Sequence, residues 1–442
     1  MEVSVITPVH PASYPYLAAA AGSLFSQTRR PDEWVIVCNG GTSPKDIPSV
    51  VSPELNVQCV LAETGDVGRI GALKARGCKE AAGDVFVELD ADDLLAPAAL
   101  QAIEDAFERH PEAAMVYSDV VPFTEGPKGE RNGIRGMIAP GLGFDEYAAI
   151  YRDPEPGKLF TAIRSPRVTA HSVSSVLYAP DHVRAWRRVP YGEVGGHNPK
   201  LAIGDDVDLT QRIYLRYGAR GIVHIPEPLY LYRRHDGQKT AEKNDRRGIY
   251  ATDALGEIVE ALYDQRAESL ALRWASDEGL LAIDLGGGLS PRPGYLTVDR
   301  AGAAIEADLE ARWPFADGAV GVLRASHVFE HLADKLHVGR ELYRVLAPGG
   351  WAFIEVPSAL GAGAFQDPTH TSYWVEESFA YWADRDYARF LPEDSRVRFQ
   401  VRRMDTRSLS LGGTLEGRMV PVIRADLVVI KDGFQPPGPI HI

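Results

Sequence analysis

The chain has 442 residues, of which 45% are hydrophobic and 24% charged, and its formal net charge is −14. This composition is typical of a globular protein and excludes collagen-like and low-complexity chains, and the length predicts two or three domains at roughly 100–200 residues each. The negative charge argues against a general polyanion-binding protein, because phosphate contacts need lysine and arginine, but it leaves room for a local basic groove.

The N-terminal segment MEVSVITPVH has neither the basic nor the apolar region of a signal peptide. No stretch approaches the roughly 18 uninterrupted apolar residues of a membrane span. The three cysteines have no metal-binding spacing, so we expect reduced thiols. Together these features predict a cytoplasmic protein without a transmembrane segment.

The first 120 residues alternate between short β-branched runs and helical stretches. The expected strands are Val3–Thr7, Glu33–Cys38, Asp84–Leu89 and Ala114–Asp119, and the expected helices are Tyr14–Gln27, Arg69–Ala82 and Pro97–Arg109. Such alternation predicts a mostly parallel sheet with helices on both faces. Ligands of such sheets bind at the carboxyl ends of the strands.

A second series of strands begins at Leu280, after a further expected helix at Asp206–Tyr217 and a polar, then helical, segment. Its runs are LLAIDLGGG, YLTVD, VGVLRASHV and GGWAFIEVP. We therefore expect an α/β chain with two Rossmann-like domains. The expected boundaries are 1–245 for the first domain, 246–278 for a helical connector, 279–432 for the second domain and 433–442 for a loosely held tail.

Three carboxylates follow the third expected strand directly, in the sequence Asp90-Ala91-Asp92-Asp93. They repel one another unless a cation joins them, and hard divalent ions take carboxylate oxygens together with substrate phosphates. The alternative is a solvated turn in which Asp92 or Asp93 caps the next helix. The residues alone leave both interpretations open.

Ordered segments across residues 1–240 resemble the family 2 glycosyltransferases, which have the A-type fold. After the opening strand, these are SLFSQTRRPDEWVIVCNGG, ALKARGCKEAAGDVFVELDADD and AIGDDVDLTQRIYLRYGARGIVHIPEPLYLYRRH. The resemblance implies a metal-dependent enzyme that moves a sugar from a nucleotide diphosphate donor to an acceptor hydroxyl with inversion.

The resemblance also implies roles for single residues. Asp90 and Asp92 match the family's DxD pair, one near the ribose and one on a Mn²⁺ or Mg²⁺ ion, and His235 matches a histidine that helps to hold the metal or the diphosphate. Asp206 would be the general base toward the acceptor, with Asp205 as its substitute. The implied nucleotide-sugar contacts are Pro8, His10, Asn39, Lys74, Asp90 and Ala91.

Other interpretations of these positions remain open. Asp206 could simply cap a helix, and His235 could be an exposed loop residue. Asn39 stands where the family has an acid, and Lys74 stands where it has an arginine, so the donor base is unsettled between UDP, GDP and dTDP.

A glycine turn follows the first strand of the second domain, Ile283–Leu285, and the next strand ends at Asp299. Such glycines allow close approach of a ligand, and an acid at the next strand end can accept hydrogen bonds from ribose hydroxyls. The turn alone is weak evidence, because many such turns contain glycines.

Together with ADLEARWPFADGAVGVLRASHVFEHL and ELYRVLAPGGWAFIEVP, the turn resembles the class I methyltransferases that use S-adenosylmethionine. The resemblance implies that Phe329, Glu330 and His331 lie near the donor and that 366–370 lies on the substrate side, with His370 either a base or a structural residue. The implied S-adenosylmethionine contacts are Asp284, Gly286, Gly287, Gly288, Asp299, Asp308 and His327.

Two departures concern this second site. Pro291 and Pro293 fall between Gly288 and Asp299, so the first helix of the family cannot form there. Ser290 replaces a third glycine, and Gly321 stands at a usual acidic position. The domain could therefore catalyse methyl transfer, bind S-adenosylmethionine without turnover, or be a scaffold that has lost the donor site.

The sequence thus predicts a glycosyltransferase fused to a methyltransferase-like domain that methylates the glycan product. The alternative is an active glycosyltransferase whose second domain only binds the acceptor or a partner. The acceptor is open between a glycan and other hydroxyl compounds, and the acidic charge makes nucleic acid the less favoured choice.

Overall fold

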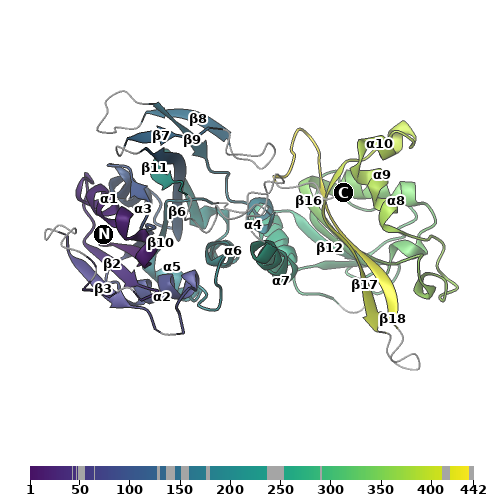
Figure 1. Cartoon of the computed structure of the whole chain (residues 1–442). Helices are drawn as coiled ribbons and strands as arrows, with labels where there is room; N and C mark the ends of the chain where they lie inside the picture. The colour runs from purple at the N-terminus through teal and green to yellow at the C-terminus, as the bar shows by residue number, and fades with distance from the viewer. Residues whose placement is uncertain are drawn as a thin grey trace. The chain divides into compact units, whose positions relative to one another are not determined.

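The computed structural model describes residues 1–41, 43–45, 47, 55–63, 65–126, 130–135, 145–150, 159–175, 180–235, 253–288, 291–410 and 419–437. The chain divides into two compact units, residues 1–267 and 268–442, and the division falls within helix α7 (Asp253–Asp277). Each unit has its own sheet (Figure 1), so the expectation of an α/β chain with two sheets is confirmed.

The sheet of the first unit has the order β3-β2-β1-β4-β10-β6-β11-β5, with β7 and β9 also paired to β6 and β8 to β9. Strands β1, β2, β3 and β4 are parallel, whereas β10 is antiparallel to both of its neighbours. The strands are β1 (Val3–Val9), β2 (Glu33–Cys38), β3 (Val57–Leu61), β4 (Val85–Glu88), β5 (Leu94–Leu95), β6 (Met115–Glu125), β7 (Arg131–Gly133), β8 (Asp145–Ile150), β9 (Leu159–Arg164), β10 (Arg184–Arg187) and β11 (Ile222–Arg233).

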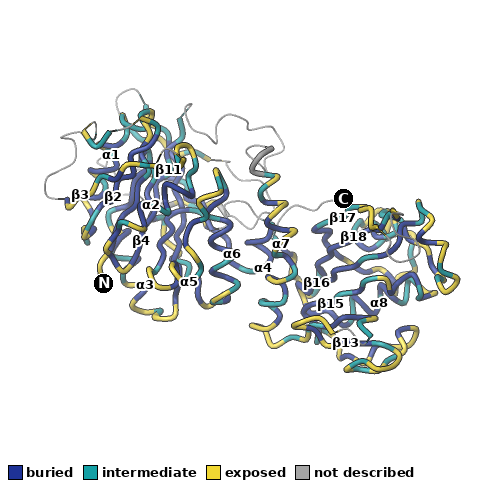
Figure 2. Tube along the Cα trace, turned by 90° about the horizontal axis from the view of Figure 1, so that it is seen from below, coloured by how far each residue is buried: buried dark blue, intermediate teal, exposed yellow. Residues whose placement is uncertain are grey.

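Strands β1, β2 and β4 read as continuous apolar runs because helices cover both faces of a parallel sheet. They are buried along almost their whole length, whereas the edge strand β3 alternates with exposed residues (Figure 2). The helices of this unit are α1 (Tyr14–Phe25), α2 (Ile70–Glu80), α3 (Ala99–Arg109), α4 (Ala170–Ser175), α5 (Arg188–Glu193) and α6 (Asp205–Tyr217).

The sheet of the second unit has the order β14-β13-β12-β15-β16-β18-β17. Its first five strands are parallel, and β18 and β17 complete it in antiparallel fashion. The strands are β12 (Leu281–Leu285), β13 (Leu296–Asp299), β14 (Ile305–Glu306), β15 (Val320–Ser326), β16 (Leu346–Pro357), β17 (Phe399–Ser410) and β18 (Met419–Val429), and the helices are α8 (Lys335–Val345), α9 (Glu376–Ala383) and α10 (Arg385–Ala388).

The connection between β12 and β13 contains no helix in its described residues, 286–288 and 291–295, as the two prolines predict. Ser290 lies outside the described residues. A Cβ at Gly321 would lie 2.7 Å from the Cβ of Ala275 on α7 and 2.9 Å from that of Leu280. No acidic side chain fits there, which gives a packing reason for the glycine at this position.

Helix α7 includes most of the expected helical connector, of which 246–252 lies outside the described residues, as does 438–442 of the expected tail. Within the part of the chain that the structure describes, every helix is too short or too polar to cross a membrane.

Candidate functional site

The carboxyl ends of β1, β2 and β4 bring several predicted site residues to one edge of the first sheet. Pro8 pairs with Val37 of β2 near the end of β1, and the main-chain N–H of Asn39 donates to the carbonyl of Val9 at 2.9 Å. The Oδ1 of Asn39 accepts from the N–H of Gly68 at 3.3 Å. This edge is where parallel sheets bind their ligands.

His10 is held against the turn that follows β2. Its Nδ1 accepts from the N–H of Ala12 at 3.3 Å, and its ring covers Gly40 so closely that a Cβ there would lie 2.3 Å from the ring Cδ2. Gly40 also has a φ of +65°, which glycine adopts without strain. The His10 ring, which follows β1, therefore packs closely against the turn after β2, beside Asn39.

The carboxylates after β4 have different environments. The Asp93 carboxyl accepts from the Tyr230 hydroxyl at 2.8 Å and from the N–H of Arg233 at 2.7 Å, and burial, with the neighbouring charges of Asp92 and Asp90, raises its pKa well above the ordinary value. Asp93 therefore has a structural role. Asp92 instead lies with its Oδ2 2.9 Å from the Nε2 of His235.

Asp92 and His235, predicted metal ligands 143 residues apart, are thus in direct contact, and each side chain is only partly buried. A carboxylate oxygen and an imidazole nitrogen fit Mn²⁺ or Mg²⁺, whose remaining positions go to water and phosphate oxygens. The Asp90 carboxylate lies elsewhere, with its Oδ2 3.9 Å from the Nε2 of His182. Ala91, between the two acids, is buried.

A buried cluster of charged side chains, the Glu88 cluster, lies behind this edge. Its members come from β4, α2, β10, the loop before α6 and the start of α6, and they are Glu88, Lys74, Arg184, His197, Asp205 and Asp206.

Glu88, the last residue of β4, is the centre of the cluster. Its carboxylate lies 2.7 Å from the Nζ of Lys74 and 3.3 Å from the Nε of Arg184, and it also accepts from the indole N–H of Trp186 at 2.6 Å. The Nε2 of His197 lies 3.0 Å from Oε1. Burial would raise the pKa of Glu88, but the two cations outweigh it and hold this pKa well below its usual range.

The two aspartates at the start of α6 differ in access and in charge. The Asp205 side chain is 4% exposed, and burial raises its pKa although Lys74 lies 3.7 Å away. The Asp206 side chain is 16% exposed and accepts from the Nη1 of Arg184 at 2.7 Å. Burial opposes ionisation there too, but Arg184 outweighs it and lowers the pKa of Asp206. Asp206 is therefore the more acidic and more accessible carboxylate of the pair.

Lys74, a predicted nucleotide contact, points into the Glu88 cluster. It is almost fully buried, and although burial alone would lower its pKa, the carboxylates of Glu88 and Asp205 raise it. The Lys74 ammonium already has two carboxylate neighbours, Glu88 and Asp205. A direct contact between Lys74 and a nucleotide stays a prediction.

Sequence reasoning missed the residues that connect these groups. His182 stacks on Tyr230 with ring centroids 4.6 Å apart and lies between Asp90 and Arg184, whose Nη2 is 2.6 Å from the imidazole Nε2. The available signal was the spacing of Arg184 and Trp186, which places both on one face of β10. That spacing did not show that β10 inserts between β4 and β6.

Gly71 on α2 determines how closely that helix approaches Asp205. A Cβ there would lie 2.4 Å from the carbonyl oxygen of Asn198 and 3.0 Å from the Cβ of Asp205. Gly71→Ala should therefore lower the thermal unfolding midpoint, although alanine favours helices by about 0.5–1 kcal/mol. Gly22→Ala on α1 is the matched control, because among the described residues no neighbouring heavy atom would lie within 4 Å of its Cβ, and it should raise the midpoint. Equal shifts in both variants would contradict the close packing at Gly71.

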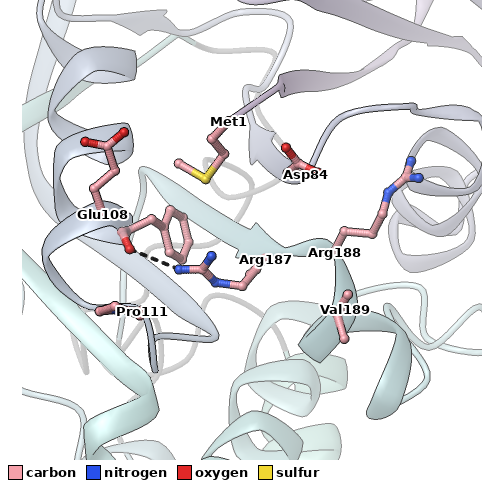
Figure 3. A pocket seen from close by; sticks show the side chains of 8 residues that line it. Met1, Asp84, Glu108, Pro111, Arg187, Arg188 and Val189 are labelled. Carbon is pink, nitrogen blue, oxygen red and sulfur yellow. Dashed lines mark hydrogen bonds between the residues drawn. The ribbon is translucent and has the colours of Figure 1, made fainter.

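A separate hollow of about 440 Å³ lies at the other end of this sheet, beside Met1 and Asp84 (Figure 3). Phe107, Arg187 and Val189 also line it, and the Arg187 guanidinium donates to the carbonyl of Phe107 at 3.1 Å. Because Met1 and Asp84 precede β1 and β4, this hollow is distinct from the edge that holds the predicted site residues.

The predicted methyl-donor residues of the second unit also meet at carboxyl ends of parallel strands. The Asp284 carboxylate, at the end of β12, is buried and accepts from the Nη1 of Arg324 at 3.0 Å. Gly286 has a φ of +68°, and a Cβ there would lie 2.3 Å from the Cγ2 of Val328. Only glycine fits this turn, which Gly287 continues.

Gly288 and Asp299 border the same space. Among the described residues, the one heavy atom within 4 Å of a Cβ at Gly288 would be the Oδ2 of Asp299, at 3.5 Å. The other oxygen of Asp299 accepts from the N–H of Arg300 at 2.7 Å. An open glycine beside a carboxylate fits a ribose of S-adenosylmethionine.

Asp308 and His327 complete the predicted set. The Asp308 carboxylate is exposed and lies 3.4 Å from the Nη2 of Arg300. His327 follows β15 with a φ of +56°, and contact with the Glu330 carboxylate raises its pKa. The structure thus places the seven predicted residues at or just beyond the ends of neighbouring strands.

Two family models match the chain. Residues 4–156 match the family described as "Glycosyl transferase family 2", and residues 281–354 match the family described as "Methyltransferase domain". The chain carries a family 2 glycosyltransferase domain and a methyltransferase domain. The resemblances seen in the sequence are thereby confirmed.

Curated relatives match shorter segments. The O-antigen biosynthesis protein RfbC of Myxococcus xanthus is 31% identical over 121 residues, which are 26% of this chain and 9% of that protein. An uncharacterized methyltransferase of Mycolicibacterium gilvum is 39% identical over 80 residues, 17% of this chain and 31% of the relative. The chain thus spans less than a third of the length of either relative.

Among solved structures, residues 1–349 of S. aureus TarS in complex with UDP-GlcNAc are 18% identical, with a TM-score of 0.42 over 62% of this chain and 73% of that one.

The matched ranges divide the candidate residues. The family 2 range contains Asn39, Lys74 and Asp90–Asp93, but it ends before Arg184, Asp206 and His235. The methyltransferase range contains Gly286–Gly288 and Glu330 but not His370. The roles proposed for Arg184, Asp206, His235 and His370 therefore rest on contacts in the structure and not on the family matches.

Proposed function

We propose that the family 2 domain is a metal-dependent glycosyltransferase that transfers a sugar from a nucleoside diphosphate to an acceptor hydroxyl with inversion. One observation carries the proposal. Asp90 and Asp206 lie on either side of the His182–Arg184 pair. The Oδ2 of Asp90 is 3.9 Å from the His182 Nε2, Arg184 lies 2.6 Å from that nitrogen, and Arg184 donates to Asp206 at 2.7 Å. The carboxylates expected on the donor side and on the acceptor side therefore lie near each other, with His182 and Arg184 between them.

Each residue then has a definite task. Asp206 accepts the proton of the acceptor hydroxyl as its oxygen forms a bond to the anomeric carbon. The bond from that carbon to the diphosphate oxygen breaks, and its electron pair leaves with the nucleoside diphosphate. Attack from the face opposite the leaving group inverts the anomeric centre. Arg184 keeps Asp206 ionised and oriented.

Asp92 and His235 would hold the divalent cation, and Asp90, whose carboxylate lies near His182, would be on the ribose side. The cation, when bound, neutralises charge on the departing diphosphate. Pro8, His10, Asn39 and Ala91 lie at or beside the same sheet edge, where they would bind the nucleotide. UDP, GDP and dTDP all remain candidate donors, and the proposed setting is the cytoplasm.

The proposal for the second domain is that it binds S-adenosylmethionine and methylates the glycan product. Gly288 would approach the cofactor while Asp299 accepts from its ribose, and Asp308 would lie on the adenine side. The similarity to RfbC, which is named as an O-antigen biosynthesis protein, supports a glycan acceptor over nucleic acid.

A second candidate function is that this domain binds acceptor or partner without turnover. The observation in its favour is the connection from β12 to β13, which has no helix in its described residues. A helix there would direct its N-terminal N–H groups toward a ligand.

One thermal-shift panel tests both domains. A ligand that binds only the folded state at 100 times its Kd stabilises it by about 2.7 kcal/mol. We expect one of UDP, GDP and dTDP to raise the unfolding midpoint only with Mn²⁺ or Mg²⁺, and S-adenosylmethionine to raise it without metal. Asp92→Asn should abolish the metal-dependent shift alone, and Asp299→Ala the cofactor shift alone.

The two variants are matched controls for each other. A cofactor shift without methyl transfer to any glycosylated product would favour the binding function. No shift with any nucleotide at saturating concentration would contradict the glycosyltransferase proposal.

A further inference from the structure

Three side chains of the second unit converge on one point beyond the end of β15. Glu330 and His331 belong to the 3-10 turn Phe329–His331, and His370 comes from the loop after β16. One potential ligand atom from each lies within 4.8 Å of the other two. The sequence placed these residues near the methyl donor or the substrate but assigned none of them to a metal.

Glu330 is a deeply buried carboxylate, with its side chain 2% exposed. Neither of its oxygens accepts a hydrogen bond of good geometry among the described residues, and the nearest cationic candidate is the Nδ1 of His327, 3.3 Å from Oε1. A buried carboxylate without such hydrogen bonds is costly unless a cation joins it. The buried position of the Glu330 carboxylate therefore indicates that it binds a cation.

One ring nitrogen of each histidine lies within 4.8 Å of a Glu330 carboxylate oxygen. The Nδ1 of His370 lies 2.8 Å from the carbonyl oxygen of Ala364, so it carries the proton and leaves the Nε2, 4.0 Å from Glu330, as an acceptor. The Nδ1 of His331 lies 3.3 Å from the carbonyl oxygen of Thr369. Metal-binding histidines are oriented in this way, by donating the other ring N–H to a carbonyl.

We propose that Glu330, His331 and His370 bind one divalent transition-metal ion, of the Zn²⁺ or Fe²⁺ type. Two imidazole nitrogens and one carboxylate oxygen suit these ions better than Mg²⁺ or Ca²⁺, which prefer oxygen. Three protein ligands leave a position for water or a substrate oxygen. Asp367, whose Oδ2 lies 3.9 Å from the Nε2 of His370, can occupy it instead.

This site would adjoin the predicted methyl-donor turn. Val328, two residues before Glu330, fills the space that a side chain at Gly286 would occupy. The ion would therefore lie on the side of the methyltransferase domain where the sequence resemblance places the substrate, separate from the Asp92–His235 pair of the other domain.

Co²⁺ titration of the full chain tests the proposal without any assay of activity. Imidazole-bound Co²⁺ absorbs visible light, and we expect one spectroscopic equivalent that Zn²⁺ displaces and Mg²⁺ does not. His331→Ala and the conservative Glu330→Gln should each weaken binding by at least tenfold. His337→Ala, on α8 outside this cluster, should bind Co²⁺ as the unaltered chain does.

The titration is repeated in the Asp92→Asn variant to remove the contribution of the other domain. If the Asp92→Asn variant still binds one Co²⁺ equivalent, the result supports the site at Glu330, His331 and His370. If that equivalent is lost, this metal-site proposal is overturned, whereas the glycosyltransferase proposal is not. An unaltered spectrum in both His331→Ala and Glu330→Gln, or no spectrum in the unaltered chain, would also overturn it. Circular dichroism shows whether each variant is folded, and Glu330→Gln retains the side-chain shape if His331→Ala does not fold.

Discussion

Replacing Asp206 by asparagine should lower the rate of sugar transfer by about 10²–10⁴-fold, the usual contribution of a general base. The amide keeps the size of the side chain and can still accept a hydrogen bond from Arg184, but it cannot take a proton from the acceptor. Donor binding should change little, because the expected donor-side residues are elsewhere. The measurement is the initial rate of nucleoside diphosphate release at saturating donor.

Asp105→Asn is the matched control, since Asp105 is an exposed carboxylate on α3 that contacts Gln101. It should leave the rate unchanged. An Asp206→Asn enzyme that retains the full rate would remove this residue as the base.

The pH dependence of the reaction gives a second check on Asp206. Because Arg184 lowers its pKa, the base remains ionised throughout the range above the ordinary aspartate value of about 3.9. Its contribution to the rate should therefore be complete at higher pH and be lost only as the pH falls below that value. An acid limb near pH 6 that vanishes in Asp206→Asn would contradict this assignment.

Replacing Glu88 by alanine should destabilise the first unit by about 3–5 kcal/mol, the usual effect of leaving a buried charge without its partner. Lys74 and Arg184 would lose the carboxylate that lies between them, and Trp186 and His197 would lose an acceptor. The measurement is the unfolding midpoint in heat or denaturant.

The double variant Lys74→Met with Glu88→Gln is the control for this cost. It removes one cation with the carboxylate and leaves the Arg184–Asp206 pair intact, while the glutamine still accepts from Trp186. It should recover most of the lost stability. A double variant no more stable than Glu88→Ala would mean that packing, not charge, explains the loss.

The stability deficit of Glu88→Ala should also depend on pH. The folded-state pKa of Glu88 is depressed, so its contribution is present above the unfolded value of about 4.3 and is lost as the pH falls through the folded value. The deficit should therefore shrink in acid. A deficit that is constant down to pH 3 would contradict the charge pairing.

The strand ends that hold the candidate sites could be predicted from the sequence, because local patterns carry them. Asp90 and Asp92 directly follow an apolar run, and Gly286–Gly288 follow another. Pro291 and Pro293 likewise predicted the missing helix from local backbone chemistry. Each of these inferences needed only a few neighbouring residues.

The contacts between distant segments could not be predicted in this way. Arg184 meets Glu88 across 96 residues because β10 inserts antiparallel between β4 and β6. The direction of Lys74, into this cluster, depends on the same insertion. His370 meets Glu330 only through the fold of the loop after β16, so the three-ligand group was visible only in the structure.

The most direct test of the central claim is release of nucleoside diphosphate from UDP-, GDP- and dTDP-sugars by the full chain, with Mn²⁺ and with chelator, across a panel of glycan acceptors. The account predicts release from one donor class that requires the ion, increases with acceptor and falls sharply in Asp92→Asn. Release that is equal with chelator, or equal in Asp92→Asn, would contradict the metal-dependent mechanism. No release from any donor would contradict the glycosyltransferase function itself.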